Sequence, residues 1–165
     1  WGPLAPSAQV QVDLQQPGQQ WQGHAYLDSN EGDEPIAHAC QEWDWSRSTM
    51  QDGSTAVIYD IQAKAGQADK LLALRFMNDG AVTTFDAPPR QALPPTAWRI
   101  QRRMRSDAPV NVVAQLEDTP FYQRALLNSV LLGEPVQSFH ETLFVPRLQS
   151  PVVQAMLPWR MPRRS

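Results

Sequence analysis

The stretch Trp21–Arg47, which reads WQGHAYLDSNEGDEPIAHACQEWDWSR, decides how the fold is interpreted. Within it, polar or aromatic side chains occupy every second position, at His24, Tyr26, Asp28 and Asn30. A β-strand sends successive side chains to opposite faces, so these four groups are expected to share one face. An imidazole, a phenol and a carboxyl lined up beside several indoles predict an apolar pocket with one acid inside it.

Two interpretations of this face stay open from spacing alone. It can be a solvated strand face whose polar groups simply meet water. Against that, Trp21 and Tyr26 are costly to leave exposed, and desolvation disfavours the charged form of an acid packed near aromatic rings. A neutral carboxylic acid can donate a proton. Asp28 is therefore the first candidate for a proton donor, with Tyr26 and His24 orienting it or holding a water.

A second aromatic pair follows in Trp43-Asp44-Trp45-Ser46-Arg47, where the period of two puts both indoles on one face. One interpretation is that the tryptophans are core residues and that Asp44 pairs with Arg47. The other is an aromatic wall for a hydrophobic or cationic ligand, because the faces of aromatic rings stabilise nearby positive charge. We add Tyr59 to this wall as a candidate binding residue.

Acidic and histidine side chains give weaker signals. Asp60 ends an apolar strand and is expected to form a turn. A calcium loop from Asp28, Asn30, Asp33 and Glu34 does not match the spacing of an EF-hand, so a polar turn is favoured. His140-Glu141 lacks the second histidine of a HExxH zinc motif, and the chain has only 3 His, so we expect no metal site.

Composition narrows the class of protein. The chain has 165 residues, enough for one domain, and a formal net charge of -3 with a pI of about 5.5. This charge argues against nucleic acid as a partner. Cys40 is the only cysteine, which excludes an intrachain disulfide. We see no signal peptide and no apolar run of about 18 residues. Because the first residue is Trp1 rather than Met, we expect a fragment or processed piece that lacks an N-terminal part.

Short segments between glycine and proline residues predict an all-β, antiparallel sandwich or barrel. The expected hairpin turns are Asp52-Gly53 and Asn78-Asp79-Gly80, where glycine supplies positive φ. Ser150–Leu157 begins Ser-Pro and predicts a short helix. The expected strands are Gln9–Leu14, Gln20–Asp28, Glu42–Ser48, Thr55–Gln62, Lys70–Met77, Ala81–Asp86, Ala97–Met104, Val110–Glu117, Phe121–Leu131 (which also suits a helix) and Val136–Val145.

Two further segments are irregular or terminal. Pro88, Pro89, Pro94 and Pro95 predict an extended connection without regular structure. The tail Met156–Arg164 combines apolar residues, one Trp and three Arg, a composition that suits the edge of a membrane as well as an ordinary basic terminus.

Six of these segments occur in an order that resembles a known family. They are GHAYLDSNEGDEP, WDWSR, AVIYD, LEDTPFYQR, HETLFVPRLQSP and MLPWRMPRR, and the resemblance extends from about Trp21 to Arg164. The order is similar to the C-terminal part of the carotenoid 1,2-hydratases, also called hydroxyneurosporene synthases. The resemblance implies a lipocalin-like or calycin-like antiparallel β-barrel, with residues 1–165 forming the second of two barrels and a short C-terminal helix.

The resemblance also implies an activity. It is the addition of water to the terminal C=C (the 1,2 position) of a long acyclic carotenoid such as neurosporene or lycopene, giving a tertiary alcohol without cofactor or metal. By position, Asp28 would be the proton donor, with Tyr26 and Trp1 as catalytic neighbours. His24, Trp43, Trp45 and Tyr59 would bind substrate. An upstream histidine expected before Trp1 is absent from this chain. The implied setting is bacterial, on the cytoplasmic side, with peripheral membrane contact.

Two other functions remain open on the residues alone. A non-catalytic lipocalin-like binder of a long apolar ligand or lipid uses the same aromatic wall but needs no acid. A scaffold domain would hold no ligand at all. Spacing alone leaves the enzyme and the binder close together, and the resemblance favours the enzyme.

Overall fold

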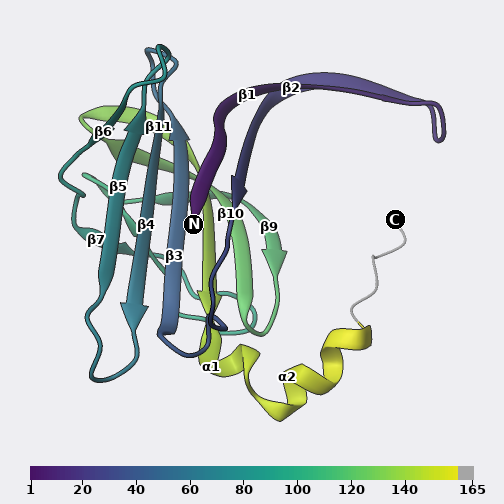
Figure 1. The fold of residues 1–165 in the computed structure, drawn as a ribbon, viewed down its shortest axis with the longest axis vertical. Helices are drawn as coiled ribbons and strands as arrows, with labels where there is room; N and C mark the ends of the chain where they lie inside the picture. The colour runs from purple at the N-terminus through teal and green to yellow at the C-terminus, as the bar shows by residue number, and fades with distance from the viewer. Residues whose placement is uncertain (160–165) are drawn as a thin grey trace.

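The computed structural model describes residues 1–159, and its centre is a seven-stranded antiparallel sheet (Figure 1). In spatial order the strands are β6-β5-β4-β3-β11-β10-β9, so β11 lies beside β3 although the two are far apart in the sequence. The strands are β3 (Cys40–Thr49), β4 (Thr55–Ala63), β5 (Lys70–Phe76), β6 (Val82–Thr84), β9 (Asn111–Asp118), β10 (Tyr122–Leu131) and β11 (Glu134–Phe144).

Tight turns join neighbouring strands of this sheet. Gly53 between β3 and β4 has a φ of 82°, and Gly80 between β5 and β6 has a φ of 88°, which confirms both predicted hairpins. Leu132 and Gly133 between β10 and β11 have φ values of 53° and 78°. Two successive positive φ values match the twist of the flanking strands, so this turn is compact.

One face of the sheet carries the hydrophobic core, and we call it the core face. Its buried residues include Ala56, Ile58, Ala73 and Leu127. The segment 85–106 covers this face and contains β7 (Arg90–Ala92) and β8 (Arg103–Arg105). These two short strands pair with each other, antiparallel, and Met104 of β8 packs in the same cluster as Leu127.

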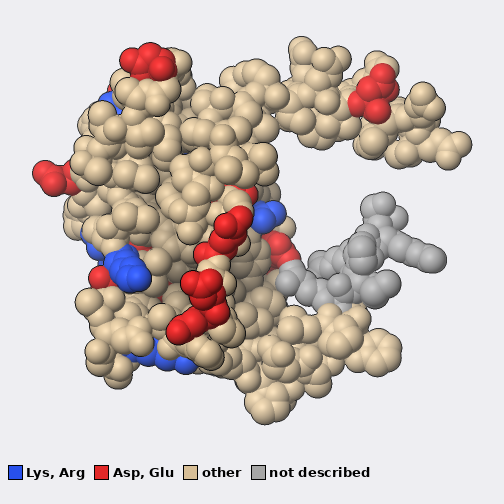
Figure 2. All heavy atoms as spheres, in the orientation of Figure 1, with Lys and Arg blue, Asp and Glu red and all other residues tan. Residues whose placement is uncertain are grey.

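The opposite face, which we call the pocket face, is met by the N-terminal hairpin. β1 (Gly2–Leu14) and β2 (Gln19–Ser29) pair with each other and form a separate two-stranded sheet. The start of β1 and the end of β2 lie against the sheet, and the rest of the hairpin bends away from it as a long arm (Figure 1). The arm carries few charged side chains (Figure 2), and Trp21 on it is exposed.

The C-terminal part is helical. α1 (Val145–Leu148) follows β11 directly, and α2 (Pro151–Met156) and the 3₁₀ helix η1 (Leu157–Trp159) come next. α2 confirms the predicted short helix Ser150–Leu157, whereas α1 is not predicted from the sequence. The hydroxyl of Ser150 accepts a hydrogen bond from the backbone N–H of Val153, which caps α2 as the Ser-Pro signal predicts. None of the helices in residues 1–159 is long and apolar enough to cross a bilayer.

The antiparallel all-β fold is confirmed, and the segment that also suited a helix is strand β10. Two local predictions are wrong. Only Arg103–Arg105 near the predicted strand Ala97–Met104 is extended, because Arg99 has a φ of 56° and breaks the segment. Its partner β7 lies inside the predicted irregular connection. Within residues 1–159 we find no closed barrel, since β6 and β9 end the sheet without pairing with each other.

Candidate active site

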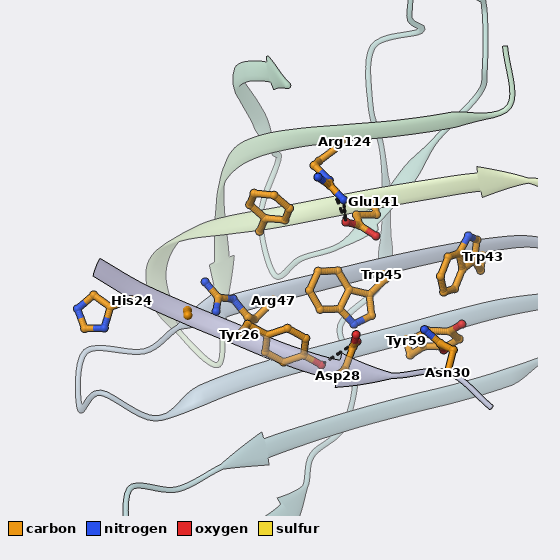
Figure 3. A pocket seen from close by; sticks show the side chains of 12 residues that line it. His24, Tyr26, Asp28, Asn30, Trp43, Trp45, Arg47, Tyr59, Arg124 and Glu141 are labelled. Carbon is orange, nitrogen blue, oxygen red and sulfur yellow. Dashed lines mark hydrogen bonds and ion pairs between the residues drawn. The ribbon is translucent and has the colours of Figure 1, made fainter. Parts of the chain in front are cut away.

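A pocket of about 340 Å³ lies between strand β2 and the pocket face of the sheet (Figure 3). From the hairpin it is lined by His24, Ala25, Tyr26 and Asp28, with Asn30 just after the end of β2. This confirms that the four alternating residues share one face. The sheet contributes Trp43, Trp45, Arg47, Tyr59, Arg124, Phe139 and Glu141.

Asp28 is half-buried in this pocket and accepts two hydrogen bonds. The indole Nε1–H of Trp1 donates to Oδ2 at 2.6 Å, and the hydroxyl of Tyr26 donates to the same oxygen at 3.2 Å. Burial raises the pKa of Tyr26, and the charge of Asp28 adds to the effect, so the phenol keeps its proton and remains a donor. Neither bond uses Oδ1. The carboxyl is therefore fixed through one oxygen while the other is available for chemistry.

Aromatic rings surround this carboxyl. The ring of Tyr26 lies 5.2 Å from that of Trp45, measured between centroids, and Trp1 lies 5.5 Å from Tyr59. Trp43 contacts Tyr59 edge-on at 5.0 Å. Trp45 and Tyr59 are buried, and burial raises the pKa of Tyr59. The structure thus brings together five aromatic side chains that the sequence proposed as catalytic or binding residues.

Trp43 and Trp45 also leave polar groups unpaired. Within residues 1–159, the buried indole N–H of each has no hydrogen-bond partner. An unpaired buried donor is unfavourable unless a water or a ligand meets it. The aromatic wall therefore contains two indole N–H groups that are buried without a hydrogen-bond partner among the described residues.

His24 does not join the aromatic cluster. It lies at the outer end of the pocket (Figure 3), is exposed, and its Nδ1 is 2.9 Å from the side-chain amide of Gln9. The prediction that it orients Asp28 is not supported by a contact, since the partners of that carboxyl are Trp1 and Tyr26.

Charged residues that the sequence did not assign to the site complete one side of the pocket. The guanidinium of Arg47 lies over the ring of Tyr26, 5.4 Å from its centroid. Arg124 forms an ion pair with Glu141 at 3.0 Å. The period of two along the strand places Arg47 on the same face as Trp45, so the sequence could have assigned Arg47 to the site. Glu141 could not be found in this way, because the register of β11 on β3 is not readable from the sequence.

The pairing of Asp44 with Arg47, one of the two interpretations of this segment, is wrong. Arg47 is on the pocket face, whereas Asp44 points to the core face, as the alternation requires. There the hydroxyl of Thr142 donates to Oδ1 of Asp44 at 2.6 Å, and burial raises the pKa of Asp44 to about 7.

Asp60 is not a turn residue, which corrects another prediction. It is 4% exposed within β4, where its carboxylate receives Nη2 of Arg90 at 2.7 Å and Nε of Arg105 at 2.7 Å. Burial by itself would raise the pKa of Asp60, but the two arginines outweigh it and lower the pKa. This cluster attaches β7 and β8 to the core face.

The candidate calcium ligands are not gathered around one point. Asp28 lies in the pocket, whereas Glu34 contacts the ring of His38 at 3.6 Å. Residues 1–159 contain no group of three or more His, Cys, Asp or Glu side chains placed to hold a metal ion.

Comparison with known proteins gives consistent matches. The family model described as carotenoid hydratase CrtC matches residues 1–165. An acyclic carotenoid 1,2-hydratase from Rubrivivax gelatinosus is 56% identical over 167 residues, which cover 100% of this chain and 41% of that protein. A second such hydratase, from Thiocapsa roseopersicina, is 49% identical over a match that covers 99% of this chain and 40% of that protein. A third, from Rhodobacter capsulatus, is 37% identical over a match that covers 100% of this chain and 59% of that protein.

The fold has a counterpart among solved structures. A candidate AttH protein from Nitrosomonas europaea superposes with a TM-score of 0.54 and 16% sequence identity, over 84% of this chain and 50% of that chain. The likeness supports the fold assignment alone. The chain spans about two fifths of the length of the first two curated relatives.

Proposed function

The chain belongs to the carotenoid hydratase family, and from this premise we propose that it forms the acid-bearing domain of an enzyme that hydrates acyclic carotenoids. The substrate is a long polyene such as neurosporene or lycopene, and water adds to its terminal C=C to give a tertiary alcohol. The observation that carries the proposal is the carboxyl of Asp28, held by Trp1 and Tyr26 inside an aromatic pocket.

We further propose that this chain is the C-terminal domain of the enzyme, the second of two barrel-like halves. Two bacterial relatives, of which the chain covers 41% and 40%, are long enough to hold such a second half. Below, "the whole enzyme" means the protein in which this domain is joined to such an N-terminal part.

Proton transfer from Asp28 is the first step of the proposed reaction. The neutral carboxyl donates its proton to the terminal CH carbon, and the π electrons form the new C–H bond. This leaves a carboxylate on Asp28 and a tertiary cation on the substrate. The donors Trp1 and Tyr26 favour this step because they stabilise the carboxylate that it produces.

The cation forms beside rings that can stabilise it. The faces of Trp45, Tyr59 and Trp43 supply negative electrostatic potential, which is worth about 2 kcal/mol for a desolvated cation on one ring. A water molecule then attacks the cation, and loss of one proton gives the alcohol. The proposed reaction consists of proton transfers and the addition of water, so it needs no redox cofactor.

Peripheral membrane contact is part of the proposal, because a long apolar carotenoid reaches the pocket from lipid. In the described part of the tail, Met156 is 49% exposed and Trp159 is 83% exposed. The arginines predicted to meet anionic lipid at positions 160, 163 and 164 lie outside the described residues.

Product analysis tests the proposed function. We expect the whole enzyme, incubated with lycopene in detergent and analysed by liquid chromatography with mass spectrometry, to give a product heavier by one water. A non-catalytic binder would return lycopene unchanged after shifting its absorption spectrum. A scaffold domain would change neither the spectrum nor the mass. Either of these two results would overturn the proposal.

A further inference from the structure

We propose that Glu141 holds the attacking water and accepts its proton, which assigns the second half of the reaction to a second carboxylate. This inference rests on the proposed hydration. Glu141 belongs to β11, pairs in register with Trp45 of β3, and lines the same pocket as Asp28. The acid comes from the hairpin and the base from the sheet, so the two carboxyl groups stand on opposite walls (Figure 3).

The orientation of Glu141 is fixed by Arg124. Both Nε and Nη2 of Arg124 contact the same oxygen, Oε1, each at 3.0 Å. Neither contact of Arg124 uses Oε2, and the hydroxyl of Tyr122 is a further hydrogen-bond partner of this carboxylate, which lines the pocket. The side chain is 18% exposed, so it is largely shielded yet open to a water molecule. A carboxylate oxygen held in this way can accept one hydrogen of a water and aim its lone pair at the cation.

A held water is needed because the cation has a competing fate. It can lose a proton from C2 or from an adjacent methyl group and return to an alkene without hydration. Capture requires a water already in place when Asp28 gives up its proton.

The proton balance closes with these two residues. A lone pair of the water oxygen forms the C–O bond, one O–H bond of the same water breaks, and Glu141 takes that proton. Asp28 has meanwhile become a carboxylate. A proton passed back through solvent from Glu141 to Asp28 restores both groups, and the net change is the addition of one water. The protonated tertiary alcohol is strongly acidic, so a carboxylate paired with Arg124 suffices as its base.

Deuterium exchange separates the two half-reactions. In D₂O, we expect Glu141→Gln in the whole enzyme to hydrate lycopene about 100-fold more slowly, as for loss of a general base. The recovered lycopene should carry deuterium at its end groups, because protonation by Asp28 continues and the cation collapses back to an alkene. Glu141→Asp, which retains a carboxylate, should recover part of the hydration.

Controls keep the two proposals distinguishable. Glu134→Gln makes the same change at the far end of β11, outside the pocket lining, and should behave as wild type. Thermal melting and the absorption spectrum of bound lycopene establish that each variant folds and binds. The inference about Glu141 fails if Glu141→Gln hydrates at the wild-type rate. It also fails if that variant folds and binds but loses exchange together with hydration. Failure of the wild-type enzyme to hydrate at all would instead remove the proposed function.

Discussion

At the scale of single residues, carboxylates of the same chemistry have different environments on the two faces of the sheet. On the pocket face, Asp28 receives two donors and faces a cavity. On the core face, Asp44 is linked through the hydroxyl of Thr142 to Nε2 of His140, 3.2 Å from that hydroxyl. Burial lowers the pKa of His140 to about 3, with the charge of Arg102 adding to the effect.

Asp44 and His140 predict an unusual dependence of stability on pH. Between about pH 4 and 6.5 the folded pair holds one proton. In the unfolded chain Asp44 has released its proton at its ordinary pKa of 3.8, and His140 holds one at its ordinary pKa of 6.5. The proton counts are equal, so this pair adds no slope to the free energy of unfolding across this range.

Replacing one residue of the pair should make the free energy of unfolding depend on pH through the residue that remains. In Asp44→Asn, unfolding takes up a proton at His140, so stability should rise with pH between about 3 and 6.5. In His140→Gln, unfolding releases the proton of Asp44, so stability should fall as pH rises from about 4 to about 7. Each slope is at most about 1.4 kcal/mol per pH unit relative to wild type. Urea denaturation across this pH range measures it, and equal slopes in all three proteins would contradict this account.

At the scale of elements, the alternation of residues along one strand predicts which side chains share a face. The sequence does not predict which distant strands pair, or in what register. The shared face of His24, Tyr26 and Asp28 follows from the period of two in β2. Glu141 comes to lie beside Trp45 only because β11 pairs with β3, and a sequence alone does not reveal which distant strands become neighbours. The sequence does not predict strand β7, because prolines flank it on both sides.

The C-terminal helices carry a prediction of their own. Val152, Met156 and Trp159 are 69%, 49% and 83% exposed, which gives this end an apolar surface. If it contacts lipid, replacing all three by serine should reduce flotation of the protein with anionic liposomes several-fold. Val113→Ser on β9, at a residue 50% exposed, provides a control that removes apolar surface elsewhere. Equal flotation of wild type and triple variant would exclude these helices as the contact.

At the scale of the whole molecule, the pocket depends on two parts that are separate in the fold. The hairpin β1–β2, with Trp1 just before β1, supplies Asp28 and both donors to its carboxyl, and the sheet supplies the aromatic wall and Glu141. Trp1 and Tyr26 pack in the same cluster as Trp45 and Tyr59, which fastens the hairpin to the sheet. The family resemblance assigns Trp1 and Asp28 to one site, whereas residue spacing does not relate them.

The most direct test of the central claim is the hydration rate of Asp28→Asn in the whole enzyme. The amide keeps the size of the side chain but has no acidic proton to give, so we expect the rate to fall by more than about 100-fold, with lycopene binding and thermal stability nearly unchanged. Asp13→Asn, the same change on the exposed part of the hairpin, should leave the rate unaltered. Turnover by Asp28→Asn at the wild-type rate would contradict the account, because the proton would then have to come from another group.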